Sequence, residues 1–374
     1  MYARLIHTSL KNAIFDGGKV ILLYGPRQVG KTTLVKTVLK DQADVLMINA
    51  DQLIYNEVFS SRDLRKMQEL IGSHRVLFID EAQNIPDIGI NLKILHDEMP
   101  DLRIIATGSS SFDLANITRE PLTGRTKTFY LYPLSAREIA DTHSVFELRQ
   151  HLESWILYGS YPGIASLQSV SEKKQQLEEL TSAYLYRDVL QLSGIKHADK
   201  VRKLLQLLAL QIGSLVSFNE LGQSLGMSQE TVTHYIDLLE KGFVLFRLPG
   251  YSNNPRKEIT KMGKVFFYDT GIRNTLINNF NPLDLRNDTG HLWENYLIVE
   301  RMKRQRYAGE RADGFFWRTY DRAEVDYVEV ANGAVNGFEM KWKKEAASSQ
   351  AWRTAYPKAG FETVNRDNFT DFIL

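Results

Sequence analysis

The sequence has 374 residues, of which 43% are hydrophobic and 24% charged, and its formal net charge is +1. A chain of this length can form two or three domains with separate cores. It contains no cysteine, which excludes disulfides and thiolate metal sites and fits a reducing cytoplasm. An apolar run long enough to span a bilayer, roughly eighteen residues, is missing, and so is an export signal. We therefore expect a cytoplasmic protein with no membrane partner.

Short apolar runs occur at residues 19–24, 45–49, 76–79 and 102–106, with helix-length segments between them. Strands that alternate with helices are typical of an α/β fold with a parallel, doubly wound sheet. Residues 135–210 have a helical pattern instead. Beyond them, a helix over residues 291–306 precedes three strand-like segments at 314–319, 324–330 and 335–342.

The first predicted strand is followed by a segment that matches the pattern G-x-x-x-x-G-K-[ST]. Its glycines let the backbone N–H groups point at phosphates, and the helix that begins near Lys31 adds its positive dipole end. Lys31 supplies a charge for the β- and γ-phosphates, while the Thr32 hydroxyl is placed to ligate magnesium. Thr33 is expected to be a helix residue rather than a ligand. The predicted nucleotide-binding residues are Gly25, Pro26, Arg27, Gln28, Val29, Gly30, Lys31, Thr32 and Thr33.

The predicted strand at 75–80 ends in two carboxylates, Asp80 and Glu81. Asp80, at the strand tip, can hold the magnesium shell. Glu81 lies beside the metal position and can orient and deprotonate the attacking water. At this distance after a phosphate-binding loop, the pair indicates ATP hydrolysis.

Two further polar groups are candidates for the same site. The strand at 102–106 is followed by residues with hydroxyl side chains, which could sense the γ-phosphate. Ser109 is the first candidate for this role and Thr107 is the second. The alternative is an ordinary hydrophilic loop. Arg125, or Arg119 just before it, could complete the site of a neighbouring subunit in a homo-oligomer as an arginine finger. Either arginine could equally be a surface residue.

These motifs resemble the AAA+ family of bacterial and archaeal ATP-binding proteins that carry a C-terminal domain of unknown function. The matching segments are residues 25–33, 78–83, 106–110, 122–125, 131–135 and 158–162. The resemblance implies a P-loop ATPase core over 1–140, a helical lid over 141–200 and a winged helix-turn-helix over 201–284. A C-terminal α/β domain similar to restriction endonucleases would follow over 285–374. ATP and Mg²⁺ are the implied cofactors.

Residues 217–240 have the pattern of a helix-turn-helix, with Gly226 in the turn and Ser228 capping the second helix. The apolar side of that helix would comprise Val232, Tyr235, Ile236 and Leu239, and Gln229, Glu230, Thr233 and His234 would face outward. Two following strand-like segments could form a wing. Six basic residues against one acid between 241 and 264, and a second basic cluster at 301–306, favour a DNA-binding surface. Docking of a protein partner is the alternative, and Glu230 does not favour DNA.

A predicted hairpin near the C-terminus brings acidic side chains and a lysine together. Glu339 and Lys341 are two residues apart and project on one face of a strand, with Asp326 on the adjacent strand. A preceding helix offers Glu294 or Glu300, which lie about 240° apart around the helix, so only one can face the hairpin; we prefer Glu294. The pattern resembles the PD-(D/E)XK nucleases, with valine in place of the motif's proline. It predicts a magnesium site formed by Asp326, Glu339 and Glu294, with Lys341 orienting water. A surface hairpin without activity is the alternative.

Two functions fit the sequence. In the first, an ATPase binds and remodels DNA, either duplex or branched like a recombination junction, and carries a nuclease-like tail. In the second, ATP gates the docking of a protein partner in signalling or defence. The excess of basic residues at 241–264 favours the first.

Overall fold

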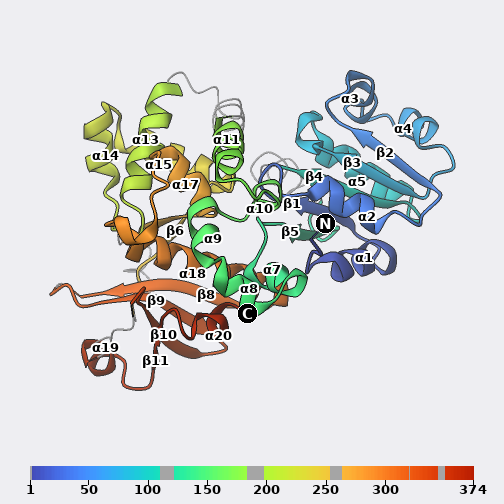
Figure 1. Ribbon diagram of the computed structural model, residues 1–374. Coiled ribbons are helices and arrows are strands. Elements are labelled where there is room, and N and C mark those ends of the chain that lie inside the picture. The colour runs from blue at the N-terminus through green and yellow to red at the C-terminus, as the bar shows by residue number, and fades with distance from the viewer. Residues whose placement is uncertain (1, 110–121, 183–197, 253–262, 320, 344–349) are drawn as a thin grey trace. The chain divides into compact units, whose positions relative to one another are not determined.

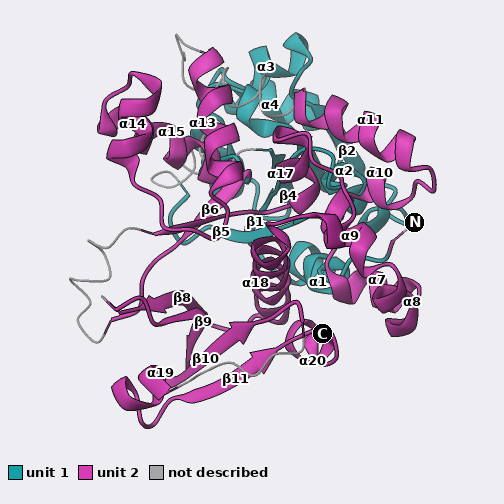
Figure 2. Ribbon diagram, turned by 60° about the vertical axis from the view of Figure 1, so that its left-hand side comes forward, with its two compact units in different colours: residues 1, 3–133, 241–243 teal, residues 2, 134–240, 244–374 magenta. Residues whose placement is uncertain are grey.

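The computed structural model describes residues 2–109, 122–182, 198–252, 263–319, 321–343 and 350–374 (Figure 1). The described chain divides into two compact units, coloured separately in Figure 2. The first contains Ala3–Pro133 and Lys241–Phe243, and the second contains Leu134–Glu240 and Val244–Leu374. In the described residues, no helix is both long and apolar enough to cross a membrane.

The first unit is built on a five-stranded parallel sheet in the order β2-β3-β4-β1-β5. Its strands are β1 (Val20–Tyr24), β2 (Val45–Asn49), β3 (Val76–Asp80), β4 (Arg103–Gly108) and β5 (Thr126–Tyr130). The sequence predicted four of them, because each is an uninterrupted apolar run. It did not predict β5, whose residues are only half-buried or exposed and which lies at the sheet edge. This α/β sheet with its helices is the expected P-loop core.

In the described residues, α1 (His7–Asp16) precedes β1, and four α-helices lie between strands: α2 (Lys31–Val38), α3 (Leu53–Phe59), α4 (Leu64–Ile71) and α5 (Ile88–Glu98). Asp63 caps α4 by accepting hydrogen bonds from the N–H groups of Arg65 and Lys66. A short 3₁₀ turn, η1 (Ala82–Asn84), follows β3 directly. The turn reverses the chain where β3 ends, which matters for the site described below.

The second unit begins with helices: α7 (Ala136–Thr142), α8 (Val145–Gln150), α9 (Leu152–Tyr158), α10 (Pro162–Ala165), α11 (Val170–Thr181) and α13 (Ala198–Leu210). Ser135 and Glu138 form a capping box at the start of α7. The helical pattern predicted for residues 135–210 is thus confirmed where the chain is described.

Two helices and a two-stranded hairpin, the predicted wing, follow: α14 (Phe218–Leu225), α15 (Gln229–Lys241), β6 (Leu245–Leu248) and β7 (Lys264–Phe267). Gly226 has φ of 61°, so the turn between the helices uses the left-handed conformation expected of it. The Ser228 hydroxyl accepts a hydrogen bond from the Thr231 N–H at 3.1 Å, which confirms the predicted cap. The four predicted apolar residues of α15 are buried, and the strands β6 and β7 form an antiparallel hairpin.

After α17 (Thr270–Leu276) and the turn η3 (Leu283–Leu285), the long helix α18 (Thr289–Ala308) leads into a four-stranded sheet of order β11-β10-β9-β8. Its strands are β8 (Ala312–Arg318), β9 (Glu324–Ala331), β10 (Ala334–Met340) and β11 (Gly360–Val364), with α19 (Gln350–Ala355) and α20 (Phe369–Ile373). Trp352 of α19 packs on Trp317 and Val328, whereas Phe372 of α20 packs on Tyr327 and Phe338. Since Tyr327 and Val328 are consecutive strand residues, the two helices cover opposite faces.

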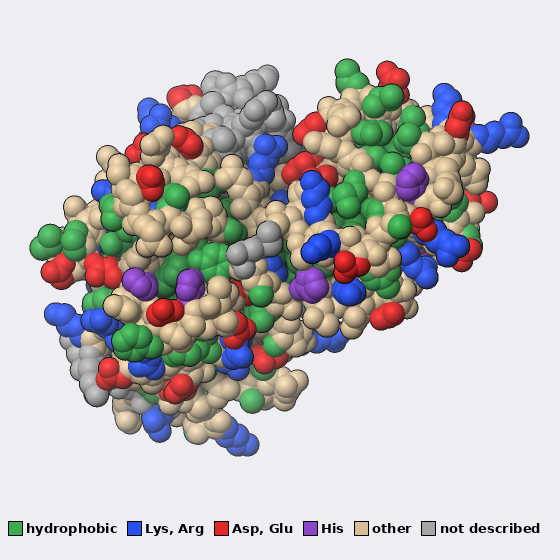
Figure 3. Space-filling model, turned by 45° about the vertical axis from the view of Figure 1, so that its right-hand side comes forward, with side chains coloured by type: hydrophobic (Ala, Val, Ile, Leu, Met, Phe, Trp, Pro, Cys, Tyr) green, Lys and Arg blue, Asp and Glu red, His purple; other side chains and the backbone are tan. Residues whose placement is uncertain are grey.

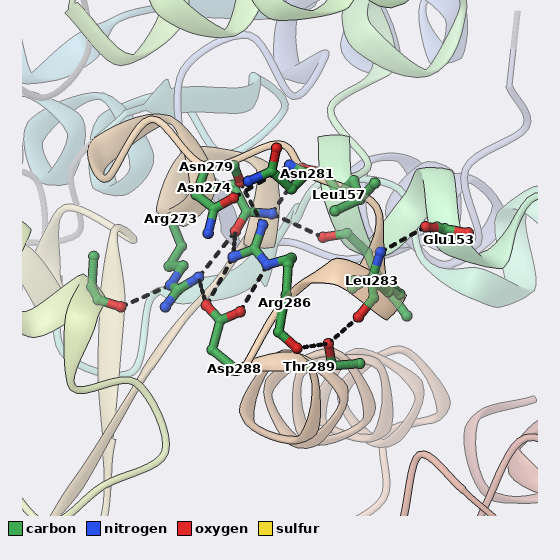
Figure 4. A network of polar contacts seen from close by, with 12 residues as sticks. Glu153, Leu157, Arg273, Asn274, Asn279, Asn281, Leu283, Arg286, Asp288 and Thr289 are labelled. Atoms are coloured by element: carbon green, nitrogen blue, oxygen red, sulfur yellow. Dashed lines mark hydrogen bonds and ion pairs between the residues drawn. The ribbon is translucent and has the colours of Figure 1, made fainter.

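A buried ionic network lies where α17, α9 and the start of α18 meet (Figure 4). Asp288 accepts hydrogen bonds from Arg273 Nη1 at 2.5 Å and from Arg286 Nε at 2.7 Å. Asn274 on α17 donates to the Leu157 carbonyl at the end of α9, at 2.9 Å. The network therefore joins α9, α17 and the start of α18, which all belong to the second compact unit.

Candidate active site

The carboxyl ends of β1, β3 and β4 lie at one edge of the first sheet, because these strands are parallel and β4 lies between the other two. The phosphate-binding loop leaves the end of β1, Asp80 ends β3, and Ser109 follows β4. Ligands of open α/β sheets bind at this edge. The sheet order thus brings together the phosphate-binding loop, Asp80 and Ser109, which lie up to about eighty residues apart in the sequence.

The phosphate-binding loop has the backbone that its glycines were expected to permit. Gly30 and Gln28 have φ of 95° and 59°, and α2 begins directly afterwards at Lys31. A Cβ atom on Gly25 would lie 2.0 Å from the Leu131 carbonyl oxygen, so only glycine fits there. Arg4 Nη1 donates to the Val29 carbonyl at 2.7 Å and steadies the loop from outside. The sequence gave no indication of this role for Arg4.

Lys31 is buried, with 5% of its surface exposed. Its Nζ donates to the carbonyl oxygens of Gly25 and Pro26, at 2.8 and 3.0 Å. The ammonium group therefore lies inside the curl of the loop, within the space where phosphate oxygens are bound in such folds. A short rotation of the side chain would exchange the two carbonyl oxygens for phosphate oxygens.

Thr32 and Asp80, the two residues predicted to hold magnesium, are hydrogen-bonded to each other. The Thr32 hydroxyl donates to Asp80 Oδ2 at 2.8 Å. The second carboxylate oxygen, Oδ1, accepts from the Thr107 hydroxyl at 2.5 Å. A hydroxyl and a carboxylate oxygen this close suit Mg²⁺, which prefers oxygen ligands and an octahedral shell completed by waters and phosphates. These residues fit the Mg²⁺–nucleotide complex that the loop implies.

Glu81 has a left-handed backbone, with φ of 53° and ψ of 42°, which is strained for a residue with a side chain. Its N–H donates to the Thr107 hydroxyl at 3.3 Å, so Thr107 is hydrogen-bonded both to the Asp80 carboxylate and to the backbone of Glu81. The turn η1 then brings Gln83 back to Glu81. Gln83 Nε2 donates to Glu81 Oε2 at 2.6 Å and to the Ser109 hydroxyl at 3.2 Å.

Gln83 is thus a site residue that the motif analysis missed, although it ends the segment 78–83 that carries the family resemblance. It connects the candidate base, Glu81, to the candidate sensor, Ser109, which is 5% exposed. Strand patterns could not show this contact, because it depends on the reversal of the chain at Glu81.

Arg125 lies at the other end of the sheet. Its carbonyl accepts from the Val20 N–H at the start of β1, whereas the phosphate-binding loop follows the end of that strand. Its guanidinium binds Asp97 at 2.8 Å, and this hydrogen bond lowers the pKa of Asp97 to about 2. Arg125 therefore cannot reach the nucleotide site of its own chain and could act only in a neighbour's site. Arg119 lies outside the described residues.

The predicted carboxylate site of the C-terminal domain is brought together in the second unit. Asp326 and Glu339 lie side by side on β9 and β10, given the register in which Tyr327 faces Phe338. Burial, followed by the negative charges of Glu294 and Glu339, raises the pKa of Asp326 to about 8. Lys341 Nζ donates to Glu339 Oε1 at 2.7 Å. Glu294 is the helix residue that faces the cluster.

Glu300 is used elsewhere, as the spacing on the helix required. It accepts from the Ala136 N–H at 2.6 Å and binds Lys303 at 2.8 Å. The prediction of a magnesium site needs a correction, however. Among the described residues, no group of three His, Cys, Asp or Glu side chains has the geometry to hold a metal ion. The cation at Glu294 is Lys264 Nζ, at 2.8 Å.

Several of the described basic residues that favoured a DNA surface are buried or paired with acids. Arg247 of the wing binds both Asp237 and Glu240, and Lys264 is 2% exposed. In the second cluster, Arg301 binds Glu329 and Lys303 is buried. The other basic wing residues, 256, 257 and 261, lie outside the described residues. On the face shown in Figure 3, Lys and Arg side chains are interspersed with Asp and Glu.

These charges were counted as exposed because a sequence does not show which of its charges are paired. The described basic residues of the two runs thus provide much less free positive charge than their number suggests.

Comparison with known proteins agrees with the geometry of the first unit. A family model described as an AAA domain matches residues 17–140. Two domains of unknown function, DUF8612 and DUF4143, match residues 149–283 and 289–367. The Walker-type ATPase PABY2304 of Pyrococcus abyssi has a similar fold, with a TM-score of 0.52 and a sequence identity of 15%. The match covers 74% of this chain and 96% of the P. abyssi chain. Fold and site together define a P-loop ATPase of the AAA class.

Two curated relatives extend this result along the chain. The "Uncharacterized protein Rv2008c" of Mycobacterium tuberculosis is 31% identical over 343 residues, which cover 90% of this chain and 73% of the relative. The protein MJ1544 of Methanocaldococcus jannaschii is 23% identical over 83% of this chain and 72% of its own length. The chain belongs to the same family as Rv2008c.

Proposed function

We propose that this protein hydrolyses ATP with Mg²⁺ and uses the nucleotide cycle to bind and remodel DNA, duplex or branched. The observation that carries the ATPase part is the hydrogen-bonded set Thr32–Asp80–Thr107 beside a phosphate-binding loop. The loop amides and Lys31 bind the phosphates, while Thr32 and Asp80 hold Mg²⁺, which would neutralise charge on the phosphate oxygens.

Glu81 accepts a proton from the water that attacks the γ-phosphorus. Its side chain is held by Gln83, so the carboxylate is oriented before substrate arrives. Ser109 lies on the other side of Gln83 and is the described hydroxyl best placed to report the γ-phosphate to that glutamine. The strained backbone of Glu81 supports this assignment, because such strain is concentrated at functional sites.

DNA as the partner is supported by the winged-helix arrangement. The second helix of the motif, α15, exposes Gln229 and His234, side chains that can donate and accept hydrogen bonds at base edges. The C-terminal domain, whose Asp326 and Glu339 lie side by side on β9 and β10 as its nuclease-like sequence pattern requires, would be a second element that contacts DNA.

The alternative, a nucleotide switch whose winged helix docks a protein partner, is favoured by one specific observation. Arg247, the described basic residue within strand β6 of the wing, is neutralised by Asp237 and Glu240 of α15. A surface that pairs its own charges offers less to a phosphate backbone and suits a protein interface better.

One experiment separates the two candidates. ATP turnover is measured with single-stranded, duplex and four-way DNA at low and high salt, for the wild type and for Lys31→Ala. We expect DNA to raise turnover at least severalfold, with the effect lost at high salt, and Lys31→Ala to abolish turnover throughout. Turnover that no DNA changes would favour the protein-docking switch. No turnover in the wild type would refute the ATPase itself.

A further inference from the structure

We propose that a pocket of the second unit binds one nucleotide of single-stranded DNA, with its phosphate on cationic side chains and its base on an aromatic platform. The pocket lies where the end of α8 and the start of α9 meet the residues that follow β10 and β11 (Figure 1). The inference rests on the proposed DNA function for its choice of polyanion, and it is independent of ATP hydrolysis.

The size and lining of the pocket suit a nucleotide. The cavity has a volume of about 520 Å³, and Leu152, Trp342 and Phe369 form its apolar lining. Sites that bind small molecules have volumes of roughly 300–1,000 Å³ and combine apolar walls with a few polar groups that fix the ligand. A base, a sugar and a phosphate therefore fit this cavity together.

The pocket also has an excess of positive charge. Its cationic side chains are Arg149, Lys343 and Arg366, and the one acid among its described lining residues is Asp367. Within the described part of the chain, none of the three cations forms an ion pair. They differ in this from Arg247 of the wing, which has two acidic partners. A bound phosphate would supply the counter-charge that the fold itself does not provide.

Two guanidinium groups of the pocket are held in place before a ligand arrives. Arg149 Nη2 donates to the Thr370 hydroxyl at the start of α20, at 2.7 Å. The guanidinium of Arg366 lies 4.6 Å from the centre of the Trp342 ring, and that ring in turn packs on Trp293 in a T-shaped contact at 5.3 Å. An arginine that lies on an aromatic ring keeps its N–H donors available to a phosphate, and its planar fork loses little freedom on binding.

The stack of Trp342 and Arg366 favours a single strand over a duplex. Arg366 is exposed, so a base can lie on the outer face of its guanidinium and continue the stack that begins at Trp342. Bases of single strands stack on aromatic rings and on arginine planes in this way. A base within a duplex is paired and is stacked on its neighbours, so it has no free face for this platform. The pocket therefore selects unpaired nucleotides.

The test is fluorescence anisotropy of a labelled oligothymidylate, titrated with the full chain without ATP at several salt concentrations. We expect Arg366→Ala to weaken binding about tenfold and to reduce the salt slope by roughly 0.7, the contribution of one phosphate contact. An abasic strand of equal length should bind the wild type at least about fivefold more weakly, and Trp342→Leu should remove this difference. Arg311→Ala is the matched control, because Arg311 is also exposed but lies outside the pocket.

Equal effects of Arg366→Ala and Arg311→Ala would overturn the proposal, and so would an abasic strand that binds as tightly as oligothymidylate. If Trp342→Leu does not fold, Arg366→Ala and the abasic strand decide, because Arg366 is exposed. Free thymidine monophosphate that binds as tightly as the strand would assign the pocket to a free nucleotide instead. A wild type that binds duplex but no single strand would overturn this inference alone, whereas no affinity for any DNA would also refute the proposed DNA function.

Discussion

Replacing Asp288 by asparagine should destabilise the second unit strongly. Asp288 accepts three hydrogen bonds from two arginines, at 2.5, 2.7 and 2.8 Å (Figure 4). The side chains of Arg273 and Arg286 are 1% and 0% exposed, so neither can be solvated when the anion is lost. Removing one partner of a buried ion pair costs about 3–5 kcal/mol. Because asparagine retains one acceptor oxygen, we expect a loss of about 3 kcal/mol.

Urea unfolding followed by tryptophan fluorescence measures this loss selectively. All five tryptophans of the chain lie between residues 134 and 374, and thus in the second unit. The matched control is Asp141→Asn, which removes an exposed pair with Arg137 (side chains 51% and 43% exposed) and should cost less than about 1 kcal/mol. A cost for Asp288→Asn no larger than that of the control would refute the reasoning.

The pH dependence provides an independent check of the same ion pairs. Burial would raise the pKa of Asp288, but the hydrogen bonds from Arg286 and the charge of Arg273 outweigh it and hold the pKa at about 2. A carboxyl with a lowered pKa stabilises the fold above its unfolded value of about 3.9, and this stabilisation is lost as the pH falls. The difference between the wild type and Asp288→Asn should therefore shrink between pH 4 and pH 2.

Three further predictions concern the ATPase site and a close backbone approach. Glu81→Gln should lower kcat about 100-fold or more while a fluorescent ATP analogue still binds; retained turnover would exclude Glu81 as the base. Gln83→Ala should lower kcat roughly tenfold with the dissociation constant of the analogue unchanged, and an equal loss of binding would contradict its positioning role. Gly159→Ala should destabilise the second unit by about 2–4 kcal/mol, because Gly159 has φ of 72° and its new Cβ would lie 1.9 Å from Asp269 Oδ1. Gly333→Ala, at φ of 79° with nothing within 4 Å, should cost only about 1 kcal/mol in the same fluorescence assay.

Much of the ATPase core could be predicted because its signals are local. The residues of β1, and those of β3 before Asp80, are all apolar and buried, since both faces of a parallel sheet are covered. Gly25, Gly30 and Lys31 occur at the fixed spacing of the phosphate-binding loop motif, so the loop can be recognised from the sequence. The helix-turn-helix was predictable for the same reason, because Gly226 and Ser228 act on their own neighbours.

Elements with weaker local signals were missed. The edge strand β5 has few buried residues, and β11 is short with an alternating pattern that any surface segment could show. The contact of Gln83 with Glu81 was also beyond the motif, because a single left-handed residue reverses the chain there.

The sequence alone was enough to predict a phosphate-binding loop at residues 25–33 and carboxylates at the ends of strands. Only the tertiary structure shows which charged side chains are exposed and which are paired with acids. Lys264 and Arg247 were indistinguishable from exposed cations in the sequence, yet both lie in ion pairs with acids on other elements. The physical reason is that burial makes the pairing of a charge obligatory, and burial is a property of the packed fold rather than of the local sequence.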